Sequence, residues 1–377
     1  MQRRKFLETG GLLTAALSLS GSSLFASTPR NALPYWKGFN LVDFNTPDPA
    51  KRYRTTTDEH LQWMADWGFN FIRLPISYPY YLSFDRSRPI EAQEVYQINE
   101  QAVDTIQGLV HQANKHRLHV SITLHRAPGY CINAGFHEPY NLWRDQEALE
   151  AYCFHWNMWA KRFKNASEKD ISFDLLNEPA MIEDMNDQLS AKGRVPGDLY
   201  RNLIKSALEA IKKENNKRIV IADGNNIGNE VIHEVLDLDV AQSCRGYFPH
   251  AISHYKAPWA NKNPEQLPLP KYPGQVGNQN FNRQLLEDYY KPWIELAAKG
   301  IGVHCGEMGA WNKTPHPVML AWMTDMLDIL ASHRIGYALW EFIGDFGIIN
   351  SGRSDVEYTD FYGNKLDKKL LSLLQKF

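Results

Sequence analysis

The chain has 377 residues, of which 44% are hydrophobic, so it can build one large core or two modest ones. Its formal net charge is −2, which gives no electrostatic basis for binding nucleic acid. The four cysteines, at positions 131, 153, 244 and 305, lack metal-binding spacing, and the histidines are dispersed without an H-E-x-x-H motif. The sequence therefore predicts no metal and no cofactor, and it does not require a disulfide framework.

The first 26 residues have the pattern of an export signal. Arg3–Arg4 precede Lys5–Phe6–Leu7, which is typical of a twin-arginine signal, and a weakly apolar run follows from residue 10 to 25. This run is too short and too polar for a transmembrane helix. We expect a signal at 1–26, with cleavage near Ala26, and a working domain at 27–377. The product would be periplasmic or extracellular, without membrane insertion; the alternative is an uncleaved tail.

Short apolar runs alternate with helical patterns along the rest of the chain. We predict strands at 38–41, 69–74, 118–124, 171–176, 218–222, 301–306 and 335–339, with a less regular one within 246–255. Strands buried on both faces form continuous apolar runs, as these do. Eight such units, and no linker that would separate a second domain, predict an α/β fold made of a single (β/α)8 TIM barrel.

The helical segments carry their own signals. A capping box at Thr56 and Glu59 predicts the start of the first helix. Aromatic and apolar residues at helical spacing between positions 149 and 163 favour packing against the barrel rather than ligand binding. The closing helix is expected at about 366–374, and the segment 257–280 is expected to be a long loop on the active face.

Polar residues follow most of the predicted strands. In a barrel of this type the site lies at the carboxyl ends of the strands, so these side chains are expected to converge. Glu178 and Glu307 end two different runs. Two carboxyls can divide the breaking of an acetal, because one donates a proton while the other attacks or stabilises the sugar cation. The full set of strand-end candidates is Arg73, His125, Asn177, Glu178, His254, Tyr255, Glu307 and Trp340.

Five motifs make residues 35–377 resemble glycoside hydrolase family 5, the cellulase-type (β/α)8 glycosidases. They are L-L-N-E-P at 175–179, G-E-M-G-A-W at 306–311, R-L-P at 73–75, H-R-A-P-G-Y at 125–130 and A-L-W-E-F at 338–342. The resemblance implies that Glu178 is the acid/base and Glu307 the nucleophile, held ionised by Arg73. It also implies that Asn177 binds the sugar 2-hydroxyl and that Trp340 floors the subsite before the cleaved bond.

The sixth strand departs from the family pattern. The family usually has H-x-Y there, whereas this chain has His254 and Tyr255 adjacent, with His250 four residues before His254. By the resemblance His125, His254 and Tyr255 would line the site. We expect either His254 or His250, but not both, to face the groove.

These observations predict a retaining glycosidase acting on β-linked glucans, foremost an endo-β-1,4-glucanase, with the two carboxyls about 5–5.5 Å apart. Alternatives are a β-mannanase, a xyloglucanase, an exo-β-1,3-glucanase, a non-catalytic glycan-binding barrel or a metal-dependent hydrolase. The expected partner is a polysaccharide or oligosaccharide substrate, and the chain is expected to be a monomer.

Overall fold

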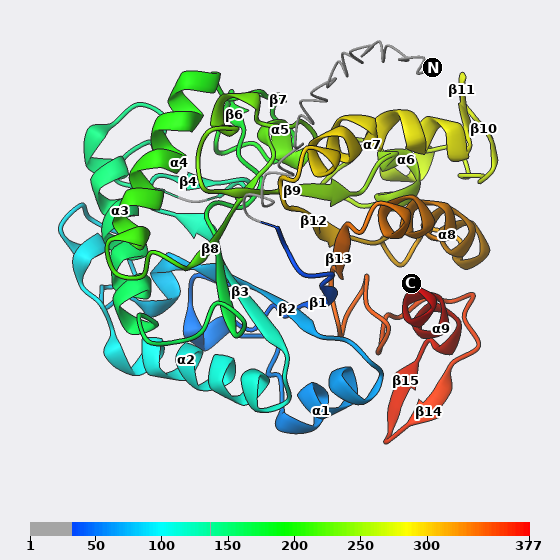
Figure 1. Cartoon of the computed structure of the whole chain (residues 1–377). Helices are drawn as coiled ribbons and strands as arrows, with labels where there is room; N and C mark the ends of the chain where they lie inside the picture. The colour runs from blue at the N-terminus through cyan, green and yellow to red at the C-terminus, as the bar shows by residue number, and fades with distance from the viewer. Residues whose placement is uncertain (1–31, 136) are drawn as a thin grey trace, which may run out of the picture.

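A computed structural model describes residues 32–135 and 137–377. Eight parallel strands form a closed barrel in the order β2-β1-β13-β12-β9-β8-β5-β3, and β3 pairs with β2 to complete the circle (Figure 1). The predicted (β/α)8 barrel is confirmed. Its strands are β1 (Lys37–Asn40), β2 (Phe71–Ser77), β3 (His119–Ala127), β5 (Ile171–Asp174), β8 (Ile219–Asp223), β9 (Ala241–Gly246), β12 (Val303–Met308) and β13 (Gly336–Leu339).

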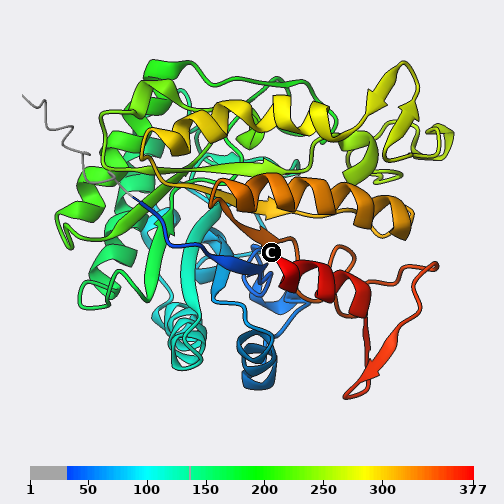
Figure 2. The ribbon, with the colours of Figure 1, turned by 45° about the vertical axis from the view of Figure 1, so that its right-hand side comes forward.

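Helices surround the barrel, and α7 and α8 lie side by side on its outer surface (Figure 2). The connection from β8 to β9 holds only the four-residue segment α5, in which Asn226 and Ile227 lack helical φ and ψ values, and one 3-10 turn. The helices are α1 (Asp58–Asp66), α2 (Glu100–Lys115), α3 (Gln146–Arg162), α4 (Gly197–Lys212), α5 (Asn225–Gly228), α6 (His250–Ser253), α7 (Arg283–Ala298), α8 (His316–Ser332) and α9 (Lys368–Lys376).

Short strands decorate the loops. β4 (Tyr130–Cys131) pairs with β3, and three hairpins are β6 (Met181–Ile182) with β7 (Lys192–Gly193), β10 (Gly274–Val276) with β11 (Gln279–Phe281), and β14 (Thr359–Phe361) with β15 (Asn364–Leu366).

The aromatic stripe on α3 packs against the barrel, as its spacing predicts. Tyr152, Trp156 and Trp159 are fully buried, and such rings supply much of the apolar area of a core. Two of them also have polar atoms that reach the sheet. The Tyr152 hydroxyl and the Trp156 indole N–H both donate to the Leu175 carbonyl, at 2.9 and 3.2 Å. The stripe therefore fixes the chain immediately before Asn177.

Two predictions about local structure are wrong in detail. The sixth strand is β9, which ends at Gly246, where the predicted segment 246–255 only begins. Its residues are mostly small or polar and give no continuous apolar run. The first helix is capped by Thr57 with His60, one position after the expected pair, because the Thr57 hydroxyl reaches the His60 N–H. The segment 257–280 lies in the long connection from β9 to α7, as expected, and contains β10 and part of β11.

Two other expectations concern the described residues only. None of their helices is long and apolar enough to cross a membrane. Their four cysteines are all free thiols, and three of them are buried. The predicted signal at 1–26 lies outside the described residues.

We predict opposite effects for alanine at two glycines. A Cβ on Gly38, in β1, would collide with the Phe71 carbonyl oxygen in the neighbouring strand, so Gly38→Ala should lower the free energy of unfolding by about 1–3 kcal/mol. Gly108 is exposed within α2, and a Cβ there would meet nothing within 4 Å. Gly108→Ala should raise the free energy of unfolding by about 0.5–1 kcal/mol. Chemical denaturation measures both, and equal values for the two variants would contradict the packing of β1 on β2.

Candidate active site

Arg73 occupies the centre of the carboxyl end of the barrel. It extends from β2 and is 1% exposed, so its charge must be compensated by neighbouring groups rather than by water. Its Nε donates to Asp174 Oδ2 at 2.7 Å, its Nη1 to Glu307 Oε1 at 2.5 Å and its Nη2 to Asn177 Oδ1 at 2.9 Å. One guanidinium from β2 thereby links side chains at the carboxyl ends of β5 and β12.

Glu178 is held by its backbone as well as by its side chain. Its φ of 49° is in the left-handed region, which is unfavourable for a residue with a Cβ and persists only where neighbours enforce it. Its N–H donates to Asp223 Oδ2 at 2.9 Å, and its carbonyl accepts from the Tyr130 hydroxyl at 2.6 Å. These two bonds restrain the unusual conformation and direct the carboxyl into the site.

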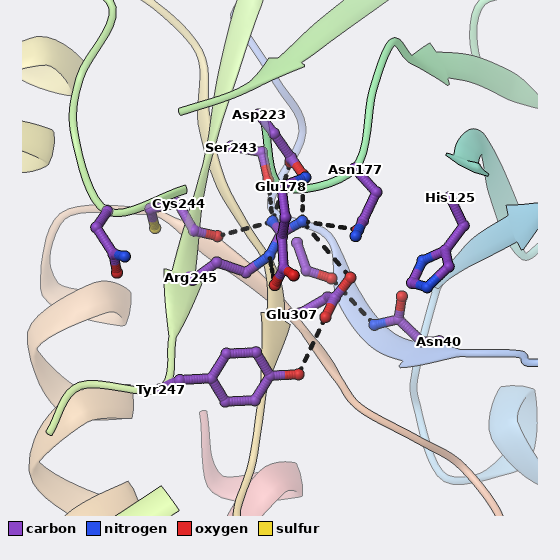
Figure 3. A network of polar contacts seen from close by, with 12 residues as sticks. Asn40, His125, Asn177, Glu178, Asp223, Ser243, Cys244, Arg245, Tyr247 and Glu307 are labelled. Atoms are coloured by element: carbon purple, nitrogen blue, oxygen red, sulfur yellow. Dashed lines mark hydrogen bonds and ion pairs between the residues drawn. The ribbon is translucent and has the colours of Figure 1, made fainter. Parts of the chain in front are cut away.

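Glu307 reaches the site through an irregularity in β12. The register of β12 against β9 shifts between Cys305 and Glu307, which re-aims the side chains that follow. Besides the bond from Arg73, the carboxyl accepts one from the Tyr247 hydroxyl at 3.1 Å, which Figure 3 shows as a dashed line. Gly306, the residue before Glu307, has no side chain to crowd the site: a Cβ there would lie 2.5 Å from Ser243 Oγ and 3.2 Å from Arg245 Nη1.

A second buried guanidinium, Arg245 from β9, joins the two glutamates. Its Nε donates to Glu178 Oε1 at 3.1 Å, and its Nη2 lies 3.5 Å from Glu307 Oε1 (Figure 3). The same side chain binds both carboxylate oxygens of Asp223 and donates to Asn177 Oδ1 at 3.1 Å. Glu178 and Glu307, distant in sequence, therefore contact one guanidinium.

Four carboxyls surround these two cations, and their protonation differs. Burial, followed by the charge of Glu307, raises the pKa of Glu178 to about 7. Burial and the neighbouring Asp223 raise the pKa of Asp174 to about 6. Burial alone would also raise the pKa of Asp223, but Arg245 and Arg73 hold it below its usual range. Near neutral pH the Glu178 carboxyl can therefore give up a proton, whereas the neighbouring Asp223 is paired with the two arginines.

Tyr247, rather than Tyr255, contacts Glu307. Tyr255 is instead buried next to Lys256, whose Nζ lies 5.9 Å from its ring centroid. Arg245 and Tyr247 have the spacing of the H-x-Y pair, with arginine in place of histidine, and this spacing could have identified both. The sequence prediction missed them because it placed the sixth strand too late. It also missed Asp174 and Asp223, each the last residue of an apolar strand.

The remaining predicted residues lie around this centre. Asn177 accepts from both arginines, and its Nδ2 has no hydrogen-bond partner among the described residues. His125 and Trp340 stack with ring centroids 5.7 Å apart. Burial lowers the pKa of His125 to about 4, so its imidazole is neutral at neutral pH.

A cavity of about 290 Å³ adjoins Glu178. Both His250 and His254 line it, so the prediction that only one of them faces the groove is wrong. The physical reason is the short helix α6, which brings the two rings to 4.9 Å from each other on one face. Trp259, 37% exposed, lines the same cavity.

Nothing in residues 32–135 and 137–377 gathers three or more His, Cys, Asp or Glu side chains into a group that could hold a metal ion. The acidic side chains of the site are directed at guanidinium groups instead.

The closed barrel and its paired strand-end carboxyls define the class of (β/α)8 glycoside hydrolases. The family described as cellulase, glycosyl hydrolase family 5, matches residues 33–345, and the chain belongs to this family.

Individual relatives agree with this assignment. Endoglucanase C of Acetivibrio thermocellus is 25% identical over 325 residues, which cover 80% of this chain and 88% of the relative. Cellodextrinase A of Ruminococcus flavefaciens is 23% identical over 307 residues, covering 79% and 83%. Among solved structures, a glycoside hydrolase with 34% sequence identity has a TM-score of 0.81 and covers 91% of this chain and 99% of its own.

The proton affinity of Glu178 should depend on Glu307. Because the charge of Glu307 helps to raise the pKa of Glu178, Glu307→Gln should lower that pKa below its value of about 7, while burial keeps it above 4.5. Carbon NMR of enzyme labelled at the glutamate carboxyls measures the titration, with Glu178→Gln identifying the signal. Glu265→Gln, an exposed glutamate paired with Lys256, is the control and should leave it unchanged. An unaltered titration in Glu307→Gln would contradict the coupling.

Proposed function

We propose that this chain is a retaining endo-β-1,4-glucanase in which Glu178 is the acid/base and Glu307 the nucleophile. The observation that carries the proposal is the contrast between the two carboxyls. Burial raises the pKa of Glu178 to about 7, which suits a general acid at neutral pH. Glu307 is paired with Arg73 at 2.5 Å and accepts from Tyr247, which suits an ionised nucleophile.

The chemistry then proceeds in two displacements. In the first, the Glu307 carboxylate forms a bond to the anomeric carbon while the glycosidic bond breaks and Glu178 gives its proton to the departing oxygen. In the second, Glu178 takes a proton from water, and the water oxygen replaces Glu307 at the anomeric carbon. Two inversions leave the configuration retained. We expect a carboxyl separation of about 5–5.5 Å, as this mechanism requires.

Two features support binding of a sugar beside Glu307. The Asn177 amide presents an N–H without a partner among the described residues, and a sugar 2-hydroxyl is the acceptor we assign to it. The stacked rings of Trp340 and His125 supply an apolar floor for the same unit. Arg73 and Arg245 both donate hydrogen bonds to Asn177 Oδ1. Since an arginine can only donate, these two bonds fix which side-chain atom of Asn177 is the oxygen.

The choice of β-1,4-glucan is supported by the endoglucanases among the relatives. The open cavity next to Glu178, with Trp259 in its wall, supports a leaving group that is itself a sugar chain. Other specificities of the family remain alternatives, namely β-mannanase, xyloglucanase and exo-β-1,3-glucanase. Hydrolysis of carboxymethylcellulose, lichenan, mannan, xyloglucan and laminarin, with product analysis, tests the proposal. Exclusive release of products from a glycan other than β-1,4-glucan would refute the stated specificity.

The two glutamates should be separable by chemical rescue. Glu307→Ala should abolish turnover on every substrate, because no group remains to form the glycosyl-enzyme. Glu178→Ala should still react with an activated aryl glycoside, whose leaving group needs no proton, and its intermediate should accumulate. Azide should rescue Glu178→Ala with retained configuration and Glu307→Ala with inverted configuration. NMR of the glycosyl azides distinguishes them, and the reverse pattern would exchange the two roles.

We further propose that the enzyme is exported as a monomer, to the periplasm or beyond the cell, through the signal at 1–26. Replacing Arg3 and Arg4 with lysine should retain the protein in the cytoplasm, as fractionation would measure, because the twin-arginine pair is the recognised feature of the signal. Unchanged export of this variant would refute the route.

A further inference from the structure

The strongest departure of this site from the H-x-Y pattern is Arg245. We propose that Arg245 is a positioning residue that holds the Glu178 carboxyl in place in both displacements and favours its ionised form in the second. This inference rests on the proposed function. Histidine offers two ring nitrogens, whereas the arginine fork carries five N–H donors and a permanent charge, so the replacement changes both geometry and electrostatics.

The contacts of Arg245 form a clamp on Glu178. Nη1 donates to Asp223 Oδ1 at 2.9 Å, Nη2 contacts Asp223 Oδ2, and Nε donates to Glu178 Oε1 at 3.1 Å. Asp223 Oδ2 also accepts from the Glu178 backbone N–H. The Arg245–Asp223 pair therefore binds Glu178 at its side chain and its main chain at once, in a bidentate arrangement that fixes direction as well as distance.

The neighbouring loop is shaped around this arginine. A Cβ on Gly228 would lie 2.6 Å from Arg245 Cγ, so only a residue without a side chain leaves room for the arginine stem. Gly228 has a φ of 75°, and the two residues before it, Asn226 and Ile227, have φ values of 51° and 64°. A β-branched residue in the left-handed region is a clear outlier, which the surrounding structure must enforce.

The charge of Arg245 has different effects at the two stages. In the free enzyme, Glu307 opposes ionisation of Glu178 and Arg245 favours it. Once Glu307 is esterified by the sugar, its negative charge is gone while Arg245 remains. Glu178 then loses its proton more readily and can accept one from water. The groups that face Glu178 from the elements around it are Arg245, Asp223, Glu307, Tyr247, Lys192, Tyr130 and Cys131.

Arg245→Met and Arg245→Lys test the clamp, and Arg218→Lys is the matched control. Arg218 is a buried arginine at the amino-terminal end of β8, where it donates to main-chain carbonyls away from the site. On an activated aryl cellobioside, Arg245→Met should lower kcat by about 10²-fold, since deprotonating water depends on Glu178. In Arg245→Met the glycosyl-enzyme should accumulate, which should lower KM and produce a burst of released phenol. The value of kcat/KM should change less than kcat.

The pH profile supplies a second readout. Removing the positive charge raises the pKa of Glu178, so on a glucan the basic limb of kcat/KM should move to higher pH in Arg245→Met. Arg245→Lys keeps the charge and loses the fork, so its basic limb should stay near that of the native enzyme while its kcat falls. The control, Arg218→Lys, should change neither limb of the pH profile nor the burst of released phenol.

Three results would overturn the inference: kcat and kcat/KM falling equally without a burst, an unmoved basic limb in Arg245→Met, or native kinetics in Arg245→Lys. If Arg245→Met does not fold, the Arg245→Lys kinetics decide. A native enzyme that cleaves neither glucans nor aryl glycosides would refute the proposed function instead.

Discussion

The site depends on the balance between two buried guanidiniums and four carboxyls. Arg73 and Arg245 are each 1% exposed, so they can remain charged only where carboxylates compensate them. Burial, together with neighbouring carboxyls, raises the pKa values of Asp174 and Glu178, whereas the two arginines hold the pKa of Asp223 below its usual range. The differences in proton affinity among the four carboxyls are therefore a property of the whole cluster.

The barrel makes this balance possible because it brings the six members together from five strands. β2 supplies Arg73 and β9 supplies Arg245, while the carboxyls follow or end β5, β8 and β12. Packing outside the barrel extends this control, since aromatic side chains of α3 bind the Leu175 carbonyl just before the site. Small positions contribute as well, because a Cβ on Gly306 would collide with Ser243 Oγ and crowd the Arg245 guanidinium. The core and the chemistry are thus parts of one arrangement.

Sequence reasoning recovered the barrel and the two glutamates because apolar strands and the motifs around Glu178 and Glu307 are visible in the chain. It could not recover the arginine–aspartate pairing, since Arg245 and Asp223 become partners only when β8 and β9 lie side by side. β9 itself was misplaced because its strand character comes from pairing with its neighbours and not from hydrophobicity. Tertiary context overrode local pattern in β9. Because the strand was predicted too late in the chain, Tyr255 was assigned to the site in place of Tyr247.

The close contact between Gly228 and Arg245 couples two positions on different elements sterically. A Cβ at position 228 would lie 2.6 Å from Cγ of residue 245, so any side chain that leaves β9 in the direction of Arg245 requires a glycine there. The constraint on position 228 thus comes from the direction of the side chain at 245 rather than from its charge. A designer who transplants this arginine into a histidine-bearing barrel would have to bring the left-handed loop with it.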